Sequence, residues 1–164
     1  MNSAFALSTD NQQDMEIEAD TAEMDDITGI SIYRGNVIVI QGSMTIMGHT
    51  LTVYFDDNDD MELAIMNGNP ATYRQLPDNS EVYDEAEALQ MEYYSLKDYV
   101  ILIDNALVIK DDGSRMTGSR IEYDTVLSRV IAKGTKTIKT KEGTTKEKKG
   151  GRVKITIKKK KQEE

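Results

Sequence analysis

Alternating apolar and polar residues dominate the central part of the chain, and this pattern favours β-strands over helices. Within residues 33–55, Gly42 and Gly48 divide the sequence into three short segments rich in apolar and β-branched residues. A period of two places successive side chains on opposite faces of a strand. In the third segment, the apolar residues of one face are Leu51, Val53 and Phe55. The stretch therefore predicts three short strands punctuated by glycine.

The same pattern recurs imperfectly along the chain. Residues 104–109 resemble residues 35–40, and residues 116–123 resemble residues 46–53. A shorter signature, small-x-x-apolar-x-apolar, begins at four positions that lie 29, 38 and 32 residues apart: Ala19, Gly48, Ala86 and Gly118. Unequal spacing indicates stacked strand units joined by hairpins of variable length, and not a strict solenoid.

Composition along the chain predicts one β domain with flexible ends. The expected parts are a flexible N-terminal segment, the β domain, a mobile loop, a possible terminal strand and a charged tail: residues 1–13, 14–139, 140–151, 152–158 and 159–164. Ala4-Phe5-Ala6 looks like the end of a secretory signal at its cleavage site. Residues 84–94 have the composition of a helix, but alternation in their second half favours a strand. We expect residues 15–19 to form one end of the sheet and either 135–139 or 153–157 to form the other.

The chain has 164 residues and a net charge of −9, but its charge is unevenly distributed. Residues 1–132 hold 25 acidic and 7 basic side chains, whereas residues 133–164 hold 13 basic and 4 acidic ones. The tail is either a solvated end of an acidic domain or a contact region for an anionic partner. The absence of cysteine excludes disulfides, thiol catalysis and cysteine-ligated metal centres. No apolar run approaches the ~20 residues that a membrane-spanning helix needs.

No catalytic motif stands out, so we expect the protein not to be an enzyme and to need no cofactor or metal. His49 is the only histidine, and the sequence contains no G-x-S-x-G elbow, Walker loop or G-x-G-x-x-G turn. Residues 56–60 begin like an EF-hand calcium loop, but Met61 stands where that loop needs glycine and Asn67 where it needs glutamate. Nucleic-acid binding is not expected either, because the basic residues lie in one tail without interleaved aromatic residues.

Several separated motifs occur in an order that is specific to one known family. They are Tyr33-x-Gly35-Asn36-Val37-Ile38-Val39-x-Gln41-Gly42-x-Met44-x-Ile46, Gly68-x-Pro70-Ala71-Thr72-Tyr73, Gln90-Met91-x-Tyr93, Lys97-Asp98-Tyr99-Val100 and Gly118-x-x-Ile121-x-Tyr123. On these residues, roughly Met15 to Lys133 resembles the OstA-like family, and within it the periplasmic bridge proteins of lipopolysaccharide transport. The tail beyond residue 139 departs from the family pattern.

This resemblance implies an all-β fold, an open twisted β-jellyroll of stacked, V-shaped antiparallel strands with an apolar interior. It implies a periplasmic protein of Gram-negative bacteria that binds lipopolysaccharide through its acyl chains. Such a protein bridges inner-membrane and outer-membrane transport complexes and delivers lipopolysaccharide to the outer membrane. The implied partners are lipopolysaccharide, the jellyroll domains of the inner-membrane complex and the outer-membrane translocon, and further copies stacked head to tail.

Candidate lipid-binding residues come from two sources. The interior lipid contacts of the family map onto five positions of this chain: Met15, Ile17, Phe55, Tyr73 and Tyr93. The family pattern implies a basic residue where this chain has Phe55. Alternation within the sequence itself adds ten apolar positions that we expect to face the interior: Val37, Val39, Ile46, Leu51, Val53, Leu63, Leu89, Met91, Leu102 and Ile121.

A second hypothesis remains open, in which the β repeats serve only head-to-tail self-assembly around a filled core without lipid. The nine methionines do not decide between the two, because methionine lines adaptable grooves and also fills cores. A carbohydrate-binding domain is disfavoured because tryptophan is absent. The basic tail has three interpretations: it is idle in solvent, it contacts phosphates or a membrane surface, or it covers the C-terminal edge of the sheet and limits stacking.

Overall fold

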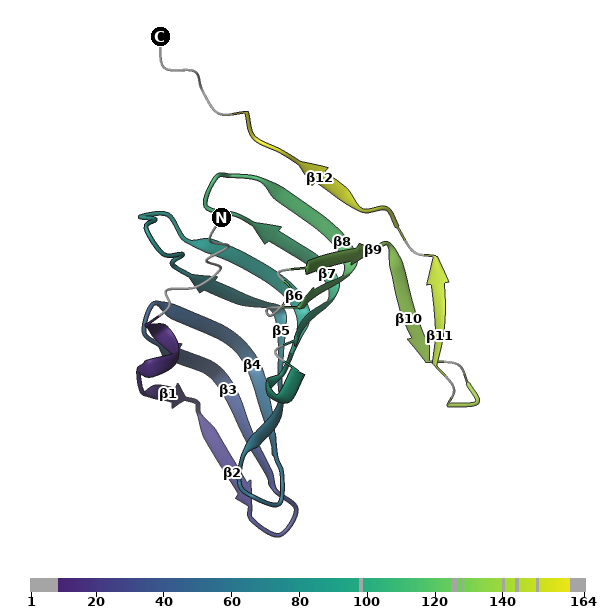
Figure 1. Cartoon of the computed structure of the whole chain (residues 1–164). Helices are drawn as coiled ribbons and strands as arrows, with labels where there is room; N and C mark the ends of the chain where they lie inside the picture. The colour runs from purple at the N-terminus through teal and green to yellow at the C-terminus, as the bar shows by residue number, and fades with distance from the viewer. Residues whose placement is uncertain are drawn as a thin grey trace.

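Bent antiparallel strands make up most of the chain in the computed structural model (Figure 1). The structure describes residues 9–159 apart from 98, 125, 126, 128, 140, 144 and 150. The strands are β1 (Met15–Glu18), β2 (Thr21–Asp25), β3 (Ile30–Gln41), β4 (Met44–Phe55), β5 (Met61–Gln75), β6 (Asp84–Tyr94), β7 (Tyr99–Ile109), β8 (Arg115–Asp124), β9 (Arg129–Lys133), β10 (Thr135–Lys139), β11 (Thr145–Lys149) and β12 (Lys154–Thr156). Two 3-10 helices accompany them, η1 (Asp10–Gln12) and η2 (Ser95–Lys97).

Ten of these strands form one open sheet. Its central order follows the chain from β3 to β8, and every neighbouring pair is antiparallel. The strands β1 and β2 both pair with β3, while β9 and β12 both pair with β8. Strands β10 and β11 pair with each other in a separate two-stranded sheet. Among the described residues, no helix is long and apolar enough to cross a membrane.

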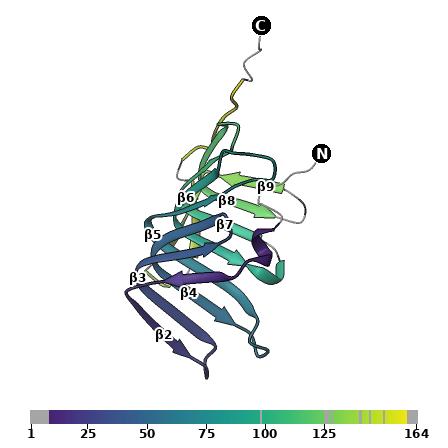
Figure 2. The ribbon, with the colours of Figure 1, turned by 90° about the vertical axis from the view of Figure 1, so that its left-hand side faces the viewer.

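The long strands bend near their middle, which folds the sheet into a V with two arms (Figures 1 and 2). The pairing register shifts at each bend, for example at residues 34–37 of β3 and 103–106 of β7. Here Asn36, Asp104 and Asn105 have positive φ angles of 45°, 62° and 51°. Asparagine and aspartate tolerate this left-handed conformation better than most residues with a side chain. The bends therefore follow from short polar residues and glycine placed at the same level of successive strands.

Each end of the sheet is one bent edge made of two short strands. We call β1 and β2 the first edge, and β9 and β12 the last edge. The first edge bends between Glu18 and Thr21, where β1 gives way to β2 along β3. The last edge is interrupted at its bend by the β10–β11 hairpin, which projects away from the sheet (Figure 1). A Cβ atom at Gly134 would collide with the carbonyl oxygen of Gly151, so the two ends of this insertion lie against each other.

The structure confirms the predicted all-β, open jellyroll-like fold and the assignment of residues 84–94 to a strand. Glycines 42 and 48 play different parts, because Gly42 makes a turn while β4 continues through Gly48 as one bent strand. The expected end strands are also present, and β12 rather than β10 lies in the main sheet. A correction concerns residues 140–151, expected to be a loop, because they contain β11. β11 consists of one threonine followed by four charged residues, so it has no apolar face and gave no strand signal.

Candidate functional site

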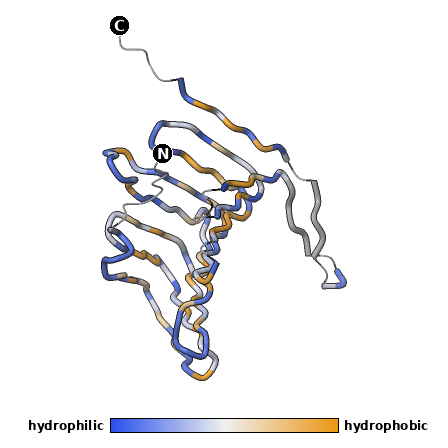
Figure 3. The backbone as a smooth tube through the Cα atoms, viewed as in Figure 1, coloured by the Kyte–Doolittle hydropathy of each residue, from blue (hydrophilic) through white to orange (hydrophobic). Residues whose placement is uncertain are grey.

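The face of the sheet that lies inside the V carries a continuous apolar cluster, and we call it the inner face. Its buried members are Val37, Val39, Leu51, Val53, Met66, Ala71, Ala88, Met91, Leu102, Ala106 and Ile121. Partly buried apolar residues from both arms pack against them, including Ile17 in β1 and Ala132 in β9. Figure 3 shows hydrophobic and hydrophilic positions alternating along the strands. The opposite, outer face therefore receives most of the polar side chains.

Cross-strand pairing arranges the inner face in rows that run from one edge of the sheet to the other. We call the arm that ends in β1 and β12 the first arm, and the arm that ends in β2 and β9 the second arm. The row on the first arm is Ile17, Val39, Ile46, Tyr73, Ala86, Val108, Met116 and Ile155. The second arm carries the row Met24, Ser31, Val53, Ala64, Tyr93, Val100, Tyr123 and Val130. The two rows together give an almost wholly apolar surface that is unbroken along the stack of strands.

Small residues occupy the bend, where the two arms come closest. Ala71 and Ala88 are fully buried there, and Ala106 is 2% exposed. At Gly48, a Cβ atom would come within 2.6 Å of both the carbonyl oxygen of Asn67 and the sulfur of Met66. Real Cβ atoms do not approach other atoms so closely, so the bend of β4 requires glycine. Small side chains at the bend, with larger ones along the arms, shape the interior as a wedge.

A buried carboxylate ties the N-terminal turn η1 to one end of the first arm. Asp10 is 4% exposed, and its carboxylate accepts hydrogen bonds from the Ser43 amide at 2.9 Å and the Ser43 hydroxyl at 2.6 Å. The side-chain amide of Gln75 donates a third, at 2.8 Å. Burial alone would raise the pKa of Asp10, but these bonds hold it below its usual value. The Tyr73 hydroxyl donates to Gln75 and extends the network toward the inner face, and burial raises the pKa of Tyr73.

A second polar network lies on the outer face of the second arm and centres on Glu122. Its carboxylate accepts hydrogen bonds from Arg120 at 2.5 Å, from the Tyr99 hydroxyl at 2.6 Å and from Lys133 at 3.3 Å. Burial by itself would raise the pKa of Glu122, but these three donors lower it to about 2. The network joins β7, β8 and β9, so it fastens half of the last edge to the sheet.

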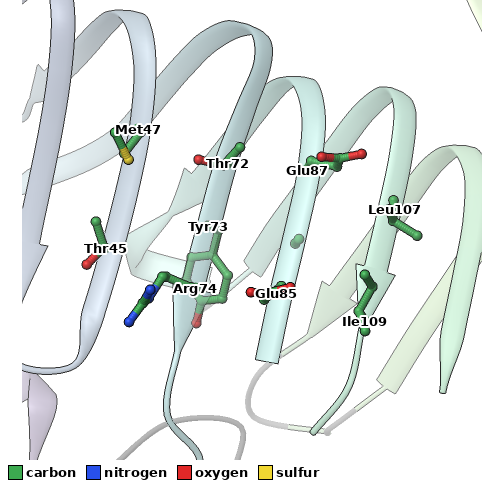
Figure 4. A pocket seen from close by; sticks show the side chains of 10 residues that line it. Thr45, Met47, Thr72, Tyr73, Arg74, Glu85, Glu87, Leu107 and Ile109 are labelled. Atoms are coloured by element: carbon green, nitrogen blue, oxygen red, sulfur yellow. The ribbon is translucent and has the colours of Figure 1, made fainter. Parts of the chain in front are cut away.

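A hollow of about 250 Å³ lies on the outer face of the first arm. Eight of the side chains labelled around it in Figure 4 belong to the outer face of β4 to β7: Thr45, Met47, Thr72, Arg74, Glu85, Glu87, Leu107 and Ile109. The ninth, Tyr73, belongs to the inner-face row. The guanidinium of Arg74 lies 3.9 Å from the centre of the Tyr83 ring. Charges of both signs next to a few apolar groups do not match an uncharged acyl chain. The inner face is therefore the better candidate for lipid.

The calcium-like sequence at residues 56–60 folds as a self-contained turn. The Asp56 carboxylate accepts hydrogen bonds from the backbone amides of Asn58 at 2.8 Å and Asp60 at 3.0 Å. Its oxygen is thus used to close its own loop, as aspartate often does in turns. In the described part of the chain, no group of three or more His, Asp or Glu side chains is arranged to hold a metal ion.

Most residues predicted to face the interior do lie on the inner face. Eleven of the fifteen belong to the apolar cluster: Ile17, Val37, Val39, Ile46, Leu51, Val53, Phe55, Tyr73, Met91, Leu102 and Ile121. Tyr93 pairs with Ala64 and Val100, which places it on the inner face. Met15 lies on the exposed first edge, at 46% exposure.

Two residues that were predicted to face the interior, Leu63 and Leu89, lie outside the inner-face rows. Leu63 pairs with Tyr54 and Tyr94 on the outer face, so its predicted inward position is wrong. Leu89 lies at the register shift between Glu87 and Gln90, outside both inner rows. The sequence also missed inner-face residues, chiefly small ones and methionines: Met61, Ala64, Met66, Ala71, Ala86, Ala88, Ala106, Met116 and Ala132. Their shared feature, a small or flexible side chain beside a strand bend, becomes visible once the bends are known.

An open antiparallel sheet of bent strands around an apolar inner face is the architecture of a lipid-transport β-jellyroll. The chain belongs to the family described as LptA/(LptD N-terminal domain) LPS transport protein, whose model matches residues 16–129. This confirms the resemblance drawn from the sequence motifs.

Similar proteins of known identity support the assignment of the chain to this family. The chain is 40% identical over 122 residues to the lipopolysaccharide export system protein LptH of Pseudomonas aeruginosa, covering 74% of this chain and 69% of that protein. It is 35% identical over 121 residues to LptA of Escherichia coli K12, covering 73% of this chain and 64% of that protein. The crystal structure of LptH from Pseudomonas aeruginosa, a periplasmic component of the lipopolysaccharide transport device and a homologue of LptA, matches with a TM-score of 0.74 and 33% identity. That match covers 92% of this chain and 99% of the LptH chain.

Proposed function

We propose that this protein holds lipopolysaccharide by its acyl chains on the inner face and carries it across the periplasm. It passes the lipid from the inner-membrane transport complex to the outer-membrane translocon, and its contacts at either end are with jellyroll domains of those complexes. Its role is that of a carrier and bridge, with no catalytic step. The observation that supports this most is the unbroken apolar inner face, which reaches both edges of the sheet in a member of the lipopolysaccharide-transport family.

The energetics of the cargo favour such a surface. Keeping one methylene group out of water is worth about 0.8 kcal/mol, so a ten-carbon segment needs about 8 kcal/mol of shielding. A row that runs through every strand lets an acyl chain exchange one apolar contact for the next without meeting water. Alanines in both rows leave room beside larger neighbours, and Met66, Met91 and Met116 can adapt to a flexible chain.

The tight burial at the centre of the V favours an alternative, in which the interior is a filled core of a structural protein. Val37 is 1% exposed and Ile121 is 2% exposed. Under the alternative, these residues pack only against each other and the sheet serves assembly alone. Under the proposal, the arms separate enough to admit acyl chains between the two rows.

Photo-crosslinking to purified lipopolysaccharide separates the two functions. A photoreactive phenylalanine analogue replaces Ile17 or Tyr73 on the inner face, and Glu18 or Thr72 on the outer face of the same strands. Each inner position is adjacent in sequence to its control, so only the direction of the side chain differs. The proposal expects adducts at Ile17 and Tyr73 and little at Glu18 and Thr72.

Equal labelling of both faces, or no labelling of the inner face in variants that retain the β-sheet circular dichroism spectrum, would favour the structural alternative. A third position, Tyr93, tests whether the row on the second arm also meets the lipid. Adducts at Tyr73 without adducts at Tyr93 would confine the cargo to the first arm.

A further inference from the structure

The two arms of the V end differently on their inner side, and we call these ends the first tip and the second tip. At the first tip, Gln75 at the end of β5 pairs with Asp84 at the start of β6, two positions outward from the apolar row of that arm. At the second tip, Phe55 pairs with Met61, and both belong to the apolar cluster. The opening of the V therefore has one polar side and one apolar side.

The polar residues of the first tip are buried although they lie at an end of the sheet. Gln75, Asp84 and Asp10 of η1 are three of the six buried polar or charged residues in the described part of the chain. Burying polar groups is unfavourable unless hydrogen bonds replace those to water. Residues that only border the solvent would stay exposed, so this cluster indicates that particular groups are held in place there.

Asp84 holds an ammonium group at the first tip. Its carboxylate accepts a hydrogen bond from the Lys110 ammonium at 2.5 Å and another from the backbone amide of Asp111 at 2.8 Å. Lys110 lies two positions beyond Val108 of the inner row, so it belongs to the inner side as well. Its side chain is 28% exposed, and an ammonium has three donors. The group is therefore fixed by a buried acid and remains accessible to a ligand.

Asp10 holds exposed amide groups at the same tip. Through its hydrogen bonds to Ser43 and Gln75, this buried acid fixes η1 beside the ends of β3, β4 and β5. The next two residues of the turn, Asn11 and Gln12, are exposed. The first tip thus has a buried layer of fixed polar groups and an accessible layer of one ammonium and two amides.

A sugar headgroup is the part of the lipid that matches these groups. Its hydroxyl and phosphate oxygens accept hydrogen bonds from ammonium and amide groups, and its hydroxyls donate to amide oxygens. An acyl chain offers no such partner, so covering the first tip with acyl chains would take polar groups from water without compensation. At the second tip the preference is reversed, because Phe55 and Met61 gain from apolar contact.

Tyr73 marks the boundary between the two kinds of surface on the first arm. It belongs to the apolar inner row, while its hydroxyl donates a hydrogen bond to Gln75 at the first tip. Tyrosine suits such a boundary because it combines an apolar ring with a polar end. The change from apolar to polar surface takes place within two residues of one strand, which is about 7 Å.

We propose that the first tip, formed by η1 with Gln75, Asp84 and Lys110, is a binding site for the sugar headgroup of the bound lipid. The acyl chains extend from this site over the inner face toward the bend and the second tip, at Phe55 and Met61. The lipid therefore has one orientation across the V. This inference rests on the proposed function, because it requires acyl chains on the inner face.

Tryptophan fluorescence locates the two ends of the lipid, because the natural chain has no tryptophan. Three reporter positions lie in β4. Met44→Trp reports from the first tip, since Met44 pairs with Gln41 and lies two positions before Ile46 of the inner row. Phe55→Trp reports from the second tip. Met47→Trp is the control on the outer face.

Two probes are compared, a lipid A with bromine on its acyl chains and a lipid A with a nitroxide on its sugar. The nitroxide should quench Met44→Trp several-fold more strongly than Phe55→Trp, because the headgroup lies at the first tip. Bromine on the chains should quench Phe55→Trp at least as strongly as Met44→Trp. Both probes should quench Met47→Trp least.

Removing the site should remove the orientation. Asp84→Asn combined with Lys110→Met deletes the ammonium and its buried partner together, so that no buried charge is left unpaired. The ratio of nitroxide quenching between the first and second tips should then fall toward one, while bromine quenching persists. Glu23→Gln combined with Arg34→Met removes an exposed ion pair elsewhere and should keep the natural ratio. Asp10→Ala, which releases η1, is a second site variant and should lower the ratio by a smaller factor.

Equal nitroxide quenching at both tips, or the natural ratio in the site variants that retain the β-sheet circular dichroism spectrum, would overturn the headgroup site. The carrier function would survive either result as long as bromine quenches Met44→Trp or Phe55→Trp more than Met47→Trp. Bromine quenching that never exceeds this control would remove the carrier function and the headgroup site with it.

Discussion

Replacing Glu122 by glutamine removes the charge at the centre of the outer-face network while keeping the size of the side chain. The carboxylate accepts hydrogen bonds from Arg120, Tyr99 and Lys133, which come from three neighbouring strands. Glu122 is 9% exposed, so water replaces these donors poorly. The variant should therefore lose global stability without altering the inner face.

The pKa sets the size of the effect. The fold lowers the pKa of Glu122 from 4.5 to about 2. At about 1.4 kcal/mol per pH unit, this difference corresponds to about 3 kcal/mol in favour of the ionised form in the folded state. Lys133 is partly exposed, with 42% of its side chain accessible, so solvent screens its share. We expect Glu122→Gln to lower the free energy of unfolding by about 2 kcal/mol at pH 7.

The pH dependence has a definite sign. A folded-state pKa below the unfolded value means that the contribution is fully present above about pH 4.5 and is lost as the pH falls toward 2. Urea unfolding followed by far-ultraviolet circular dichroism at pH 7, 5, 4 and 3 should show a gap between the natural protein and the variant that narrows below pH 4.5. Glu81→Gln, a change at an exposed acid, serves as the control and should shift stability by less than about 0.5 kcal/mol. A gap that stays constant down to pH 3, or no gap at pH 7, would refute the assigned role of the charge.

Three further substitutions test other parts of the structure. Asp10→Ala should release the η1 turn from the sheet and lower the local stability there by about 1–3 kcal/mol, which faster amide hydrogen exchange in the neighbouring residues would show. The midpoint of global unfolding should stay nearly unchanged. Gly48→Ala should destabilise the sheet by about 1–3 kcal/mol in urea unfolding, because its Cβ meets the neighbouring backbone, whereas His49→Ala at the exposed adjacent position should change little. Ile121→Ala should cost about 2–5 kcal/mol of unfolding free energy, and Leu63→Ala on the outer face clearly less; similar losses would contradict the assignment of the two faces.

Period-two alternation and the family motifs together predicted most of the large apolar residues of the inner face, but they missed its alanines and several methionines. Alternation gave a wrong face only where a strand breaks its own period. Met61 pairs with Phe55 on the inner face, and the register then shifts between Phe55 and Tyr54. Glu62 is the extra residue at this step, so Leu63 falls on the outer face although it lies two positions after Met61. A one-residue slip moves every later side chain to the opposite face. The sequence carries no local sign of this step, and only the pairing partner reveals it.

The sequence repeats located the bends without revealing what they were. Residues 104–109 match residues 35–40 because both segments pass through a bend in the left-handed conformation, at Asn36 and at Asp104 and Asn105. Glycine and asparagine read naturally as the ends of separate strands. In the fold, hydrogen bonding resumes after the register shift, so the two strands predicted on either side of Gly48 are one bent strand, β4. Neighbouring strands bend at the same level of the sheet, and the sequence of a single strand does not contain this information.

The pleat of the edge strands keeps apolar and charged side chains apart. In β1, Ile17 faces the interior while Glu16 and Glu18 face outward; in β12, Ile155 faces the interior while Lys154 faces outward. A one-residue slip of β1 along β3 would turn Glu18 into the apolar interior, where an unpaired charge is very unfavourable. The same holds for Lys154 if β12 slips along β8. The outward charges therefore disfavour every register but the one that leaves the inner face apolar up to both edges of the sheet.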